Sequence, residues 1–108
     1  MSSARVRSLD LDAVMAALRQ WAGSLAGLQE VRQVVRIGSL AHGTWSTRSD
    51  ADVVVVVNEH TADGELRYRP SGALGIGLDL FVRTDDEIAA MGKRFAAEVA
   101  AGLPLFER

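Results

Sequence analysis

Residues 38–57, GSLAHGTWSTRSDADVVVVV, begin with a glycine and a serine and end in five consecutive valines. An unbroken run of β-branched residues is typical of a strand covered on both faces, so residues 53–57 predict a central strand. Asp50 and Asp52 stand where this strand begins. Because alternate residues of a strand point to the same face, we expect these two carboxylates to project together.

The spacing of the two aspartates indicates a site for a cation. Two carboxylates held this close repel each other unless positive charge lies between them. Mg²⁺ prefers oxygen ligands and is typically bound by one or two carboxylates together with substrate phosphates. A Ser-Asp-Ala-Asp segment is also ordinary turn chemistry, so the pair alone leaves both a metal site and a simple loop open.

A third acid, Asp79, lies between two leucines in residues 76–83, which predict a further strand. An aspartate buried in a strand is costly unless it is paired, hydrogen-bonded or bound to a metal. If this strand lies beside residues 51–57, three carboxylates can hold two cations, an arrangement that clamps the attacking and leaving oxygens in phosphoryl transfer. The alternative is an Asp79 in water at the edge of the sheet, which the nearby Gly75 and Gly77 allow.

Gly38 and Ser39 follow another predicted strand, residues 31–37, and are expected to open a short helical turn. Glycine lets the backbone approach a ligand closely, and amides at the start of a helix favour anions. A Gly-Ser pair by itself usually marks a simple turn. An anion-binding corner that faces a metal-binding acid pair, however, indicates a site for a nucleoside triphosphate.

Two further segments predict helices that flank the strands. Residues 9–28 have apolar side chains at helical spacing, and Ser8 or Asp10 could cap this helix. Residues 84–102 begin with the capping-box sequence TDDE and predict one continuous helix. Its apolar stripe is expected to comprise Ile88, Met91, Phe95 and Val99.

The remaining segments predict connections and a docked tail. Residues 58–77 contain glycines, a proline and several charges, and predict a connection in which any helix is short. Residues 103–108, LPLFER, keep three apolar side chains and are expected to fold back onto the core. The order of elements predicts an α+β (α/β) fold with a three- or four-stranded sheet, in one domain over residues 1–108 with residues 1–8 flexible.

Composition limits the class of protein. The chain has 108 residues, with 12 basic and 14 acidic side chains and a formal net charge of −2, so binding to nucleic acid or an anionic membrane is not expected. The absence of cysteine excludes disulfides, thiolate catalysis and zinc-thiolate sites. No apolar run reaches the roughly 18 residues that a membrane span needs, and no signal-peptide pattern is evident, so we expect a cytoplasmic protein.

Taken together, these residues resemble the nucleotidyltransferase superfamily typified by DNA polymerase β. The small size is similar to that of the minimal nucleotidyltransferases, which are often paired with a HEPN-domain partner. The resemblance covers about residues 10–106 and implies a mixed sheet flanked by helices. The matching motifs are Ile37-Gly38-Ser39, Arg48-Ser49-Asp50-Ala51-Asp52-Val53 and Leu78-Asp79-Leu80.

The resemblance implies a role for each of the three acids. Asp50, Asp52 and Asp79 would be the catalytic residues and would together bind two Mg²⁺ ions. A hydroxyl group of the acceptor would attack the α-phosphate in line and release pyrophosphate. Asp79 would help to activate that hydroxyl.

Three further residues are assigned to the phosphates. The resemblance implies that Gly38 and Ser39 bind the β- and γ-phosphates of the nucleotide. Arg48 could contact the triphosphate or orient a carboxylate, or it could be a solvated loop residue. His42 and Trp45 could likewise touch the nucleotide, although a surface position and a packing role respectively are the simpler interpretations.

In paired systems of this family, the nucleotidyltransferase acts as an antitoxin that transfers AMP from ATP to a tyrosine of the HEPN toxin, a ribonuclease. The resemblance therefore implies a protein adenylyltransferase. Its partners would be ATP or another nucleoside triphosphate and a HEPN-domain protein, and it could also form a homo-oligomer.

Two alternatives to this function stay open. The protein could mask its partner without catalysis, or it could modify a small molecule, although relatives of that kind usually carry an additional helical domain.

Overall fold

The computed structural model describes residues 11–38, 51–70 and 77–108. Five predicted site or cap residues lie outside the described residues: Ser8, Asp10, Ser39, Arg48 and Asp50. The elements in chain order, with η for short 3-10 helices, are α2 (Leu11–Ser24), η1 (Leu25–Gly27), β1 (Val31–Ile37), β2 (Ala51–Val57), η2 (Gly64–Arg67), β3 (Leu78–Thr84), α3 (Asp85–Ala90), α4 (Lys93–Ala101) and β4 (Leu103–Glu107).

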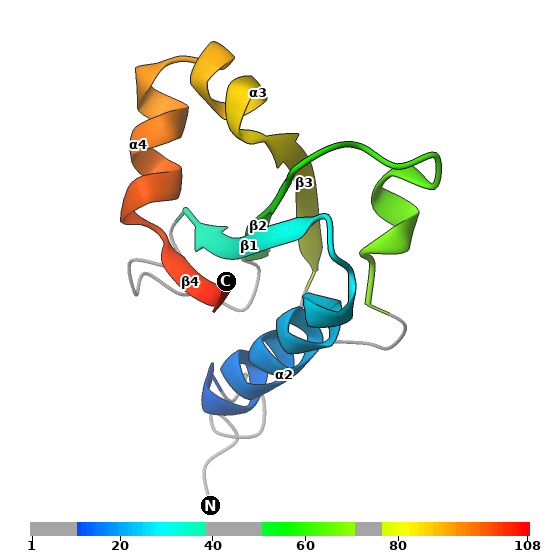
Figure 1. Cartoon of the computed structure of the whole chain (residues 1–108). Coiled ribbons are helices and arrows are strands. Elements are labelled where there is room, and N and C mark those ends of the chain that lie inside the picture. The colour runs from blue at the N-terminus through cyan, green and yellow to red at the C-terminus, as the bar shows by residue number, and fades with distance from the viewer. Residues whose placement is uncertain (1–10, 39–50, 71–76) are drawn as a thin grey trace, which may run out of the picture.

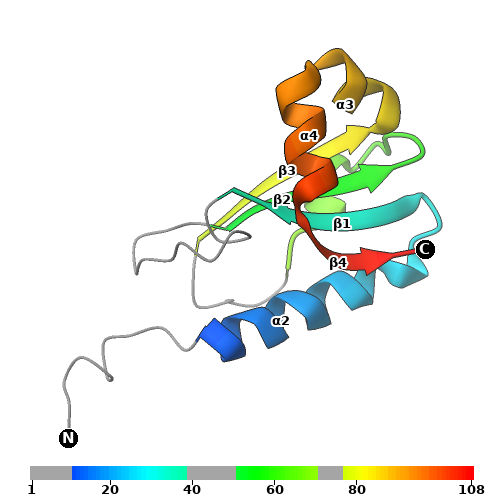
Figure 2. The ribbon, with the colours of Figure 1, turned by 90° about the vertical axis from the view of Figure 1, so that its left-hand side faces the viewer.

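The strands form one four-stranded mixed sheet in the order β3-β2-β1-β4. β1 is antiparallel to both of its neighbours, β2 and β4, whereas β2 and β3 run parallel. The end of β1 and the starts of β2 and β3 therefore lie at the same end of the sheet (Figure 2). The predicted α+β fold with a mixed sheet is confirmed.

Helices cover both faces of the sheet, with α2 on one face and the α3–α4 pair on the other (Figures 1 and 2). The five valines at residues 53–57 are each at most 1% exposed. They alternate between the two cores: Val53 packs with the residues of α2, and Val54 packs with those of α3 and α4. This double coverage confirms the predicted central strand and explains why its sequence is apolar without interruption.

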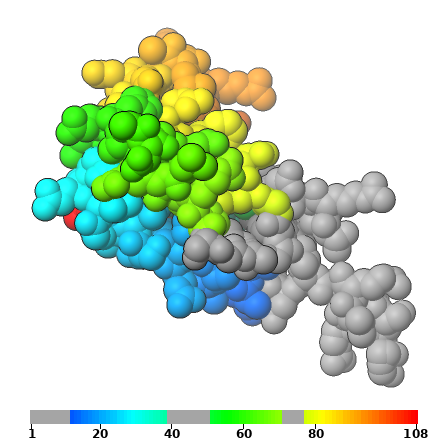
Figure 3. Space-filling view, turned by 90° about the vertical axis from the view of Figure 1, so that its right-hand side faces the viewer, coloured from blue at the N-terminus to red at the C-terminus, as the bar shows by residue number. Residues whose placement is uncertain are grey.

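Tyr68 anchors the connection between β2 and β3. Its side chain is buried in the core beneath α2, and Trp21 Nε1 donates a hydrogen bond to its carbonyl oxygen at 2.7 Å. Glu30 accepts hydrogen bonds from the Tyr68 hydroxyl at 2.9 Å and from Arg67 Nε at 2.6 Å. Residues 58–70 cover the surface between α2 and the α3–α4 pair (Figure 3). These contacts therefore attach the β2–β3 connection to α2 and to Glu30, the residue before β1.

The segment predicted to be one helix over residues 84–102 forms two helices, so this prediction is wrong. Gly92, between α3 and α4, has a φ of +110°, a conformation that L side chains rarely adopt. Met91, assigned to the apolar stripe, is 48% exposed at this break. The other three residues of the predicted stripe, Ile88, Phe95 and Val99, do pack on the sheet.

The tail folds back onto the core, as predicted, by forming the edge strand β4 against β1. Arg108 holds the end of the chain in place by donating hydrogen bonds to the backbone carbonyls of Ala26, Leu28 and Val31, at 2.8, 2.9 and 2.6 Å.

A membrane-spanning helix would need greater length and a more apolar sequence than any helix in the described part of the chain has.

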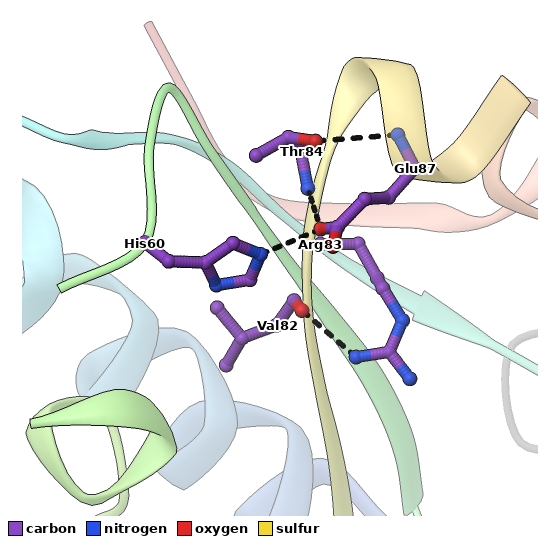
Figure 4. A network of polar contacts seen from close by, with 5 residues as sticks. All are labelled: His60, Val82, Arg83, Thr84 and Glu87. Atoms are coloured by element: carbon purple, nitrogen blue, oxygen red, sulfur yellow. Dashed lines mark hydrogen bonds and ion pairs between the residues drawn. The ribbon is translucent and has the colours of Figure 1, made fainter. Parts of the chain in front are cut away.

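Thr84 and Glu87 form the capping box that the sequence predicts at the start of α3 (Figure 4). Thr84 Oγ1 accepts a hydrogen bond from the Glu87 amide at 3.2 Å, and the Glu87 carboxylate accepts one from the Thr84 amide at 2.8 Å. His60 Nε2 lies 2.6 Å from the same carboxylate oxygen, and this contact links the β2–β3 connection to the start of α3. The hydrogen bond from the Thr84 amide, followed by that from His60, lowers the pKa of Glu87.

Glu87→Gln should remove a pH-dependent part of the stability. Because folding lowers the pKa of Glu87 below its ordinary value of 4.5, its contribution is complete above that pH and is lost as the pH falls through the lower folded value. The difference in Tm between wild type and Glu87→Gln, followed by circular dichroism, should therefore be largest near neutral pH and shrink in acid. A difference that stays constant with pH, or one matched by Glu59→Gln in the same connection, would contradict this.

Gly102→Ala should destabilise the contact between α4 and β1. A Cβ at Gly102 would lie 2.5 Å from the Arg36 carbonyl oxygen and 2.5 Å from Val35 Cγ1. We expect the free energy of unfolding, measured with urea, to fall by about 1–3 kcal/mol, the usual cost of overpacking. The control Gly23→Ala in α2, whose Cβ would meet nothing within 4 Å, should be neutral or stabilising. Equal effects of the two substitutions would contradict the steric explanation.

Candidate functional site

Asp52 and Asp79 are direct neighbours in the parallel pairing of β2 and β3. Residues paired in this register point to the same face of the sheet. That face is the one covered by α3 and α4, because Val54 and Phe81, two residues further along each strand, pack there. The two carboxylates therefore project side by side from the start of their strands.

Asp79 combines the two positions that the sequence left open: it lies beside Asp52, and it also lies at the edge of the sheet. β3 is an edge strand and the Asp79 side chain is exposed, whereas Asp52, on the central strand β2, is half-buried. The cost of burying a charge is therefore not what brings the two acids together. The register of the strands does so, and it leaves one carboxylate open to water.

Gly38 lies against the Asp52 carboxylate. It follows Ile37, which pairs with Asp52 across the antiparallel register of β1 and β2. Its φ is +82°, and a Cβ at this position would lie 3.0 Å from Asp52 Oδ2. The corner that ends β1 and the acid at the start of β2 thus come into contact, although a long stretch of sequence separates them.

The other predicted site residues, Ser39, Arg48 and Asp50, lie outside the described residues, as do His42 and Trp45. Their placement and roles stay predictions. Within residues 11–38, 51–70 and 77–108, no group of three or more histidine or carboxylate side chains that could hold a metal ion is found. That part of the chain contributes two carboxylates, which are oxygen donors of the kind that Mg²⁺ prefers.

Sequence reasoning did not single out Arg36, a buried charge two residues before Gly38. Its side chain is 2% exposed and contacts Met15 Sδ of α2, so it lies on the opposite face of the sheet from Asp52 and Asp79. Burial, followed by the nearby charge of Arg19, lowers the pKa of Arg36. The signal for it was an arginine between Val35 and Ile37 in the apolar half of the strand VRQVVRI.

Comparisons with known proteins agree with the fold. The family model of the nucleotidyltransferase domain matches residues 18–98. A candidate nucleotidyltransferase from Sulfolobus solfataricus has a similar crystal structure, with a TM-score of 0.61 over 100% of this chain and 90% of that one, at 16% sequence identity. At this identity, the likeness shows the fold alone. No curated protein matches the sequence.

Asp79→Asn should stabilise the protein when no divalent cation is present. Like charges directly opposite each other in a sheet destabilise it, so we expect the free energy of unfolding in EDTA and low salt to rise by about 0.2–1 kcal/mol. Added salt should reduce the gain, because it screens the repulsion. The control Glu98→Gln, on the exposed side of α4, should change stability little. A loss of stability in Asp79→Asn would contradict repulsion between the two acids.

Proposed function

The chain belongs to the nucleotidyltransferase domain family, and we propose that it transfers a nucleoside monophosphate, AMP from ATP, to a hydroxyl group of a protein partner. The observation that carries the proposal is the arrangement of three residues at one end of the sheet. Asp52 is in register with Asp79, and Gly38 lies against the Asp52 carboxylate. This arrangement supports an acid cluster facing a phosphate-binding corner.

Divalent cations are used generally by domains of this family, and two Mg²⁺ ions are proposed here. Asp52 and Asp79, together with Asp50, would hold them. The fit rests on the donors: two carboxylates on one face, one half-buried and the other open to solvent, can approach the same ion. Bound Mg²⁺ would neutralise charge that develops on the phosphates and would make the acceptor hydroxyl more acidic.

The phosphates of the nucleotide are proposed to bind at the corner that follows β1. Gly38 has the positive φ and the missing side chain that let a backbone approach a ligand closely. Ser39 and Arg48 would add a hydroxyl donor and a positive charge, as the family resemblance implies. The corner would hold the triphosphate next to Asp52, because Gly38 already lies against that carboxylate.

Asp79 is proposed to act on the acceptor side of the reaction. It lies on the edge strand and is exposed, so an incoming hydroxyl group can reach it. The acceptor oxygen would form a bond to the α-phosphorus while the bond to the bridging oxygen of pyrophosphate breaks. Asp79 would draw the proton from the hydroxyl, and pyrophosphate would leave on the side of the corner.

A HEPN-domain protein is proposed as the acceptor, which would give this chain an antitoxin role. The support is the resemblance to minimal nucleotidyltransferases. A second argument comes from the fold: α2, α3 and α4 all pack on the sheet, so no helix of the described residues forms a separate unit for binding an acceptor. A partner or a second copy is proposed to supply the acceptor surface.

Transfer of label from ATP tests the proposal. The wild-type chain, ATP labelled at the α-phosphate, Mg²⁺ and the product of a neighbouring HEPN gene should give a labelled partner and free pyrophosphate. Asp52→Asn should lower the rate by about 100-fold or more, the usual scale for losing one electrostatic group at a reacting centre, with little change in Tm. The control Glu98→Gln should transfer label at the wild-type rate.

Two outcomes would contradict the proposal. Label transfer that survives in EDTA, or in Asp52→Asn, would exclude the acids as the site of catalysis. Neutralisation of the partner that survives in Asp52→Asn without any transfer would favour masking of the partner instead.

A further inference from the structure

We propose that Gly38 is a positioning residue for the Asp52 carboxylate, in addition to any contact that its backbone makes with phosphate. The inference rests on the proposed function for its consequence, but its physical basis is independent of that function. A Cβ at Gly38 would lie 3.0 Å from Asp52 Oδ2, 3.9 Å from Cγ and 4.0 Å from Cβ of the same residue. These three nearest atoms all belong to the Asp52 side chain.

The contact follows from the strand pairing. Ile37, the last residue of β1, is opposite Asp52 in the antiparallel register, so the next residue lies beside the Asp52 side chain. The chain turns there with a φ of +82°, which places the Gly38 backbone against the acid. Any larger residue would need the carboxylate oxygen to move by a few tenths of an ångström, because a contact of this length is tighter than carbon and oxygen normally allow.

The other glycines with positive φ show that backbone conformation alone does not explain this position. Gly64 has a φ of +60° and Gly92 one of +110°, yet a Cβ at either would meet nothing within 4 Å. Alanine at Gly64 or Gly92 would therefore strain only the backbone. Alanine at Gly38 would strain the backbone and also displace a carboxylate that is in register with Asp79.

Displacement of this size matters for a metal ligand. Side chains that bind a metal or act in catalysis must be held within about 0.5 Å of their productive positions, and a shift of a few tenths of an ångström uses up much of that tolerance. Gly38 would thus fix the distance between the phosphate-binding corner and the Asp52 carboxylate, because its backbone lies against that side chain. Substitution of Gly38 should weaken cation binding even if the corner itself keeps its shape.

A double-mutant cycle on stability, measured without metal or nucleotide, tests the contact. Gly38→Ala should lower Tm by about 4 °C or more beyond the effect of Gly64→Ala, the matched control for positive φ. In an Asp52→Ala background this excess should disappear, because no carboxylate remains to be displaced. An excess that persists in that background would overturn the inference. Asp52→Ser serves the same purpose if Asp52→Ala does not fold.

Binding of Mn²⁺, followed by electron paramagnetic resonance, tests the consequence. Wild type and Gly64→Ala should bind Mn²⁺ with equal affinity, and Gly38→Ala should bind it about 10-fold or more weakly. Equal affinity in Gly38→Ala would overturn the positioning role, even with the contact present in the cycle. A wild-type chain that binds no Mn²⁺ would instead overturn the proposed function and the positioning role with it, and the cycle would then report the contact alone.

Discussion

The parallel register of β2 and β3 is the constraint on which the candidate site depends. A slip of one residue would turn every side chain of one strand to the other face, and Asp52 and Asp79 would then lie on opposite sides of the sheet. The two ends of the valine run oppose such a slip, because it would move Asp52 or Asn58 into a position where a valine is now buried. The apolar run at residues 53–57 thus fixes the position of the polar residues that precede it.

The connection between β2 and β3 supports the same register. Parallel strands need a crossover, and the described part of this one, residues 58–70, contains only the short helix η2. Tyr68 compensates for the missing longer helix, since its side chain enters the core beneath α2 and its carbonyl accepts the Trp21 hydrogen bond. The antiparallel partner β1 then completes the site, because it ends where β2 begins and brings Gly38 to Asp52.

The sequence predicted the features that depend on local residue patterns better than those that depend on contacts between distant segments. The buried strand β2 and the capping box at Thr84 are local, and both predictions are confirmed. The apolar spacing of the last helix continues across Gly92, so periodicity alone could not reveal the break there. Residues 103–107 form a fourth strand only because the edge of β1 is available. The motif predicted that the corner at Gly38 faces the acids, but the direct contact with the Asp52 carboxylate follows from the register of β1 and β2, which one sequence does not show.

The place of the acids along their strands also has a physical reason. Carboxylates further along β2 would lie among Val54 and Val56, beneath α3 and α4, where burying a charge costs several kcal/mol. At the start of the strands, Asp52 is half-buried and Asp79 exposed, so much of that cost is avoided. Each buried valine contributes roughly 1.5–3 kcal/mol, which readily offsets the repulsion between two partly solvated charges. A strongly apolar strand can therefore begin next to acidic residues, because the buried valines supply the stability that offsets the repulsion between the like charges.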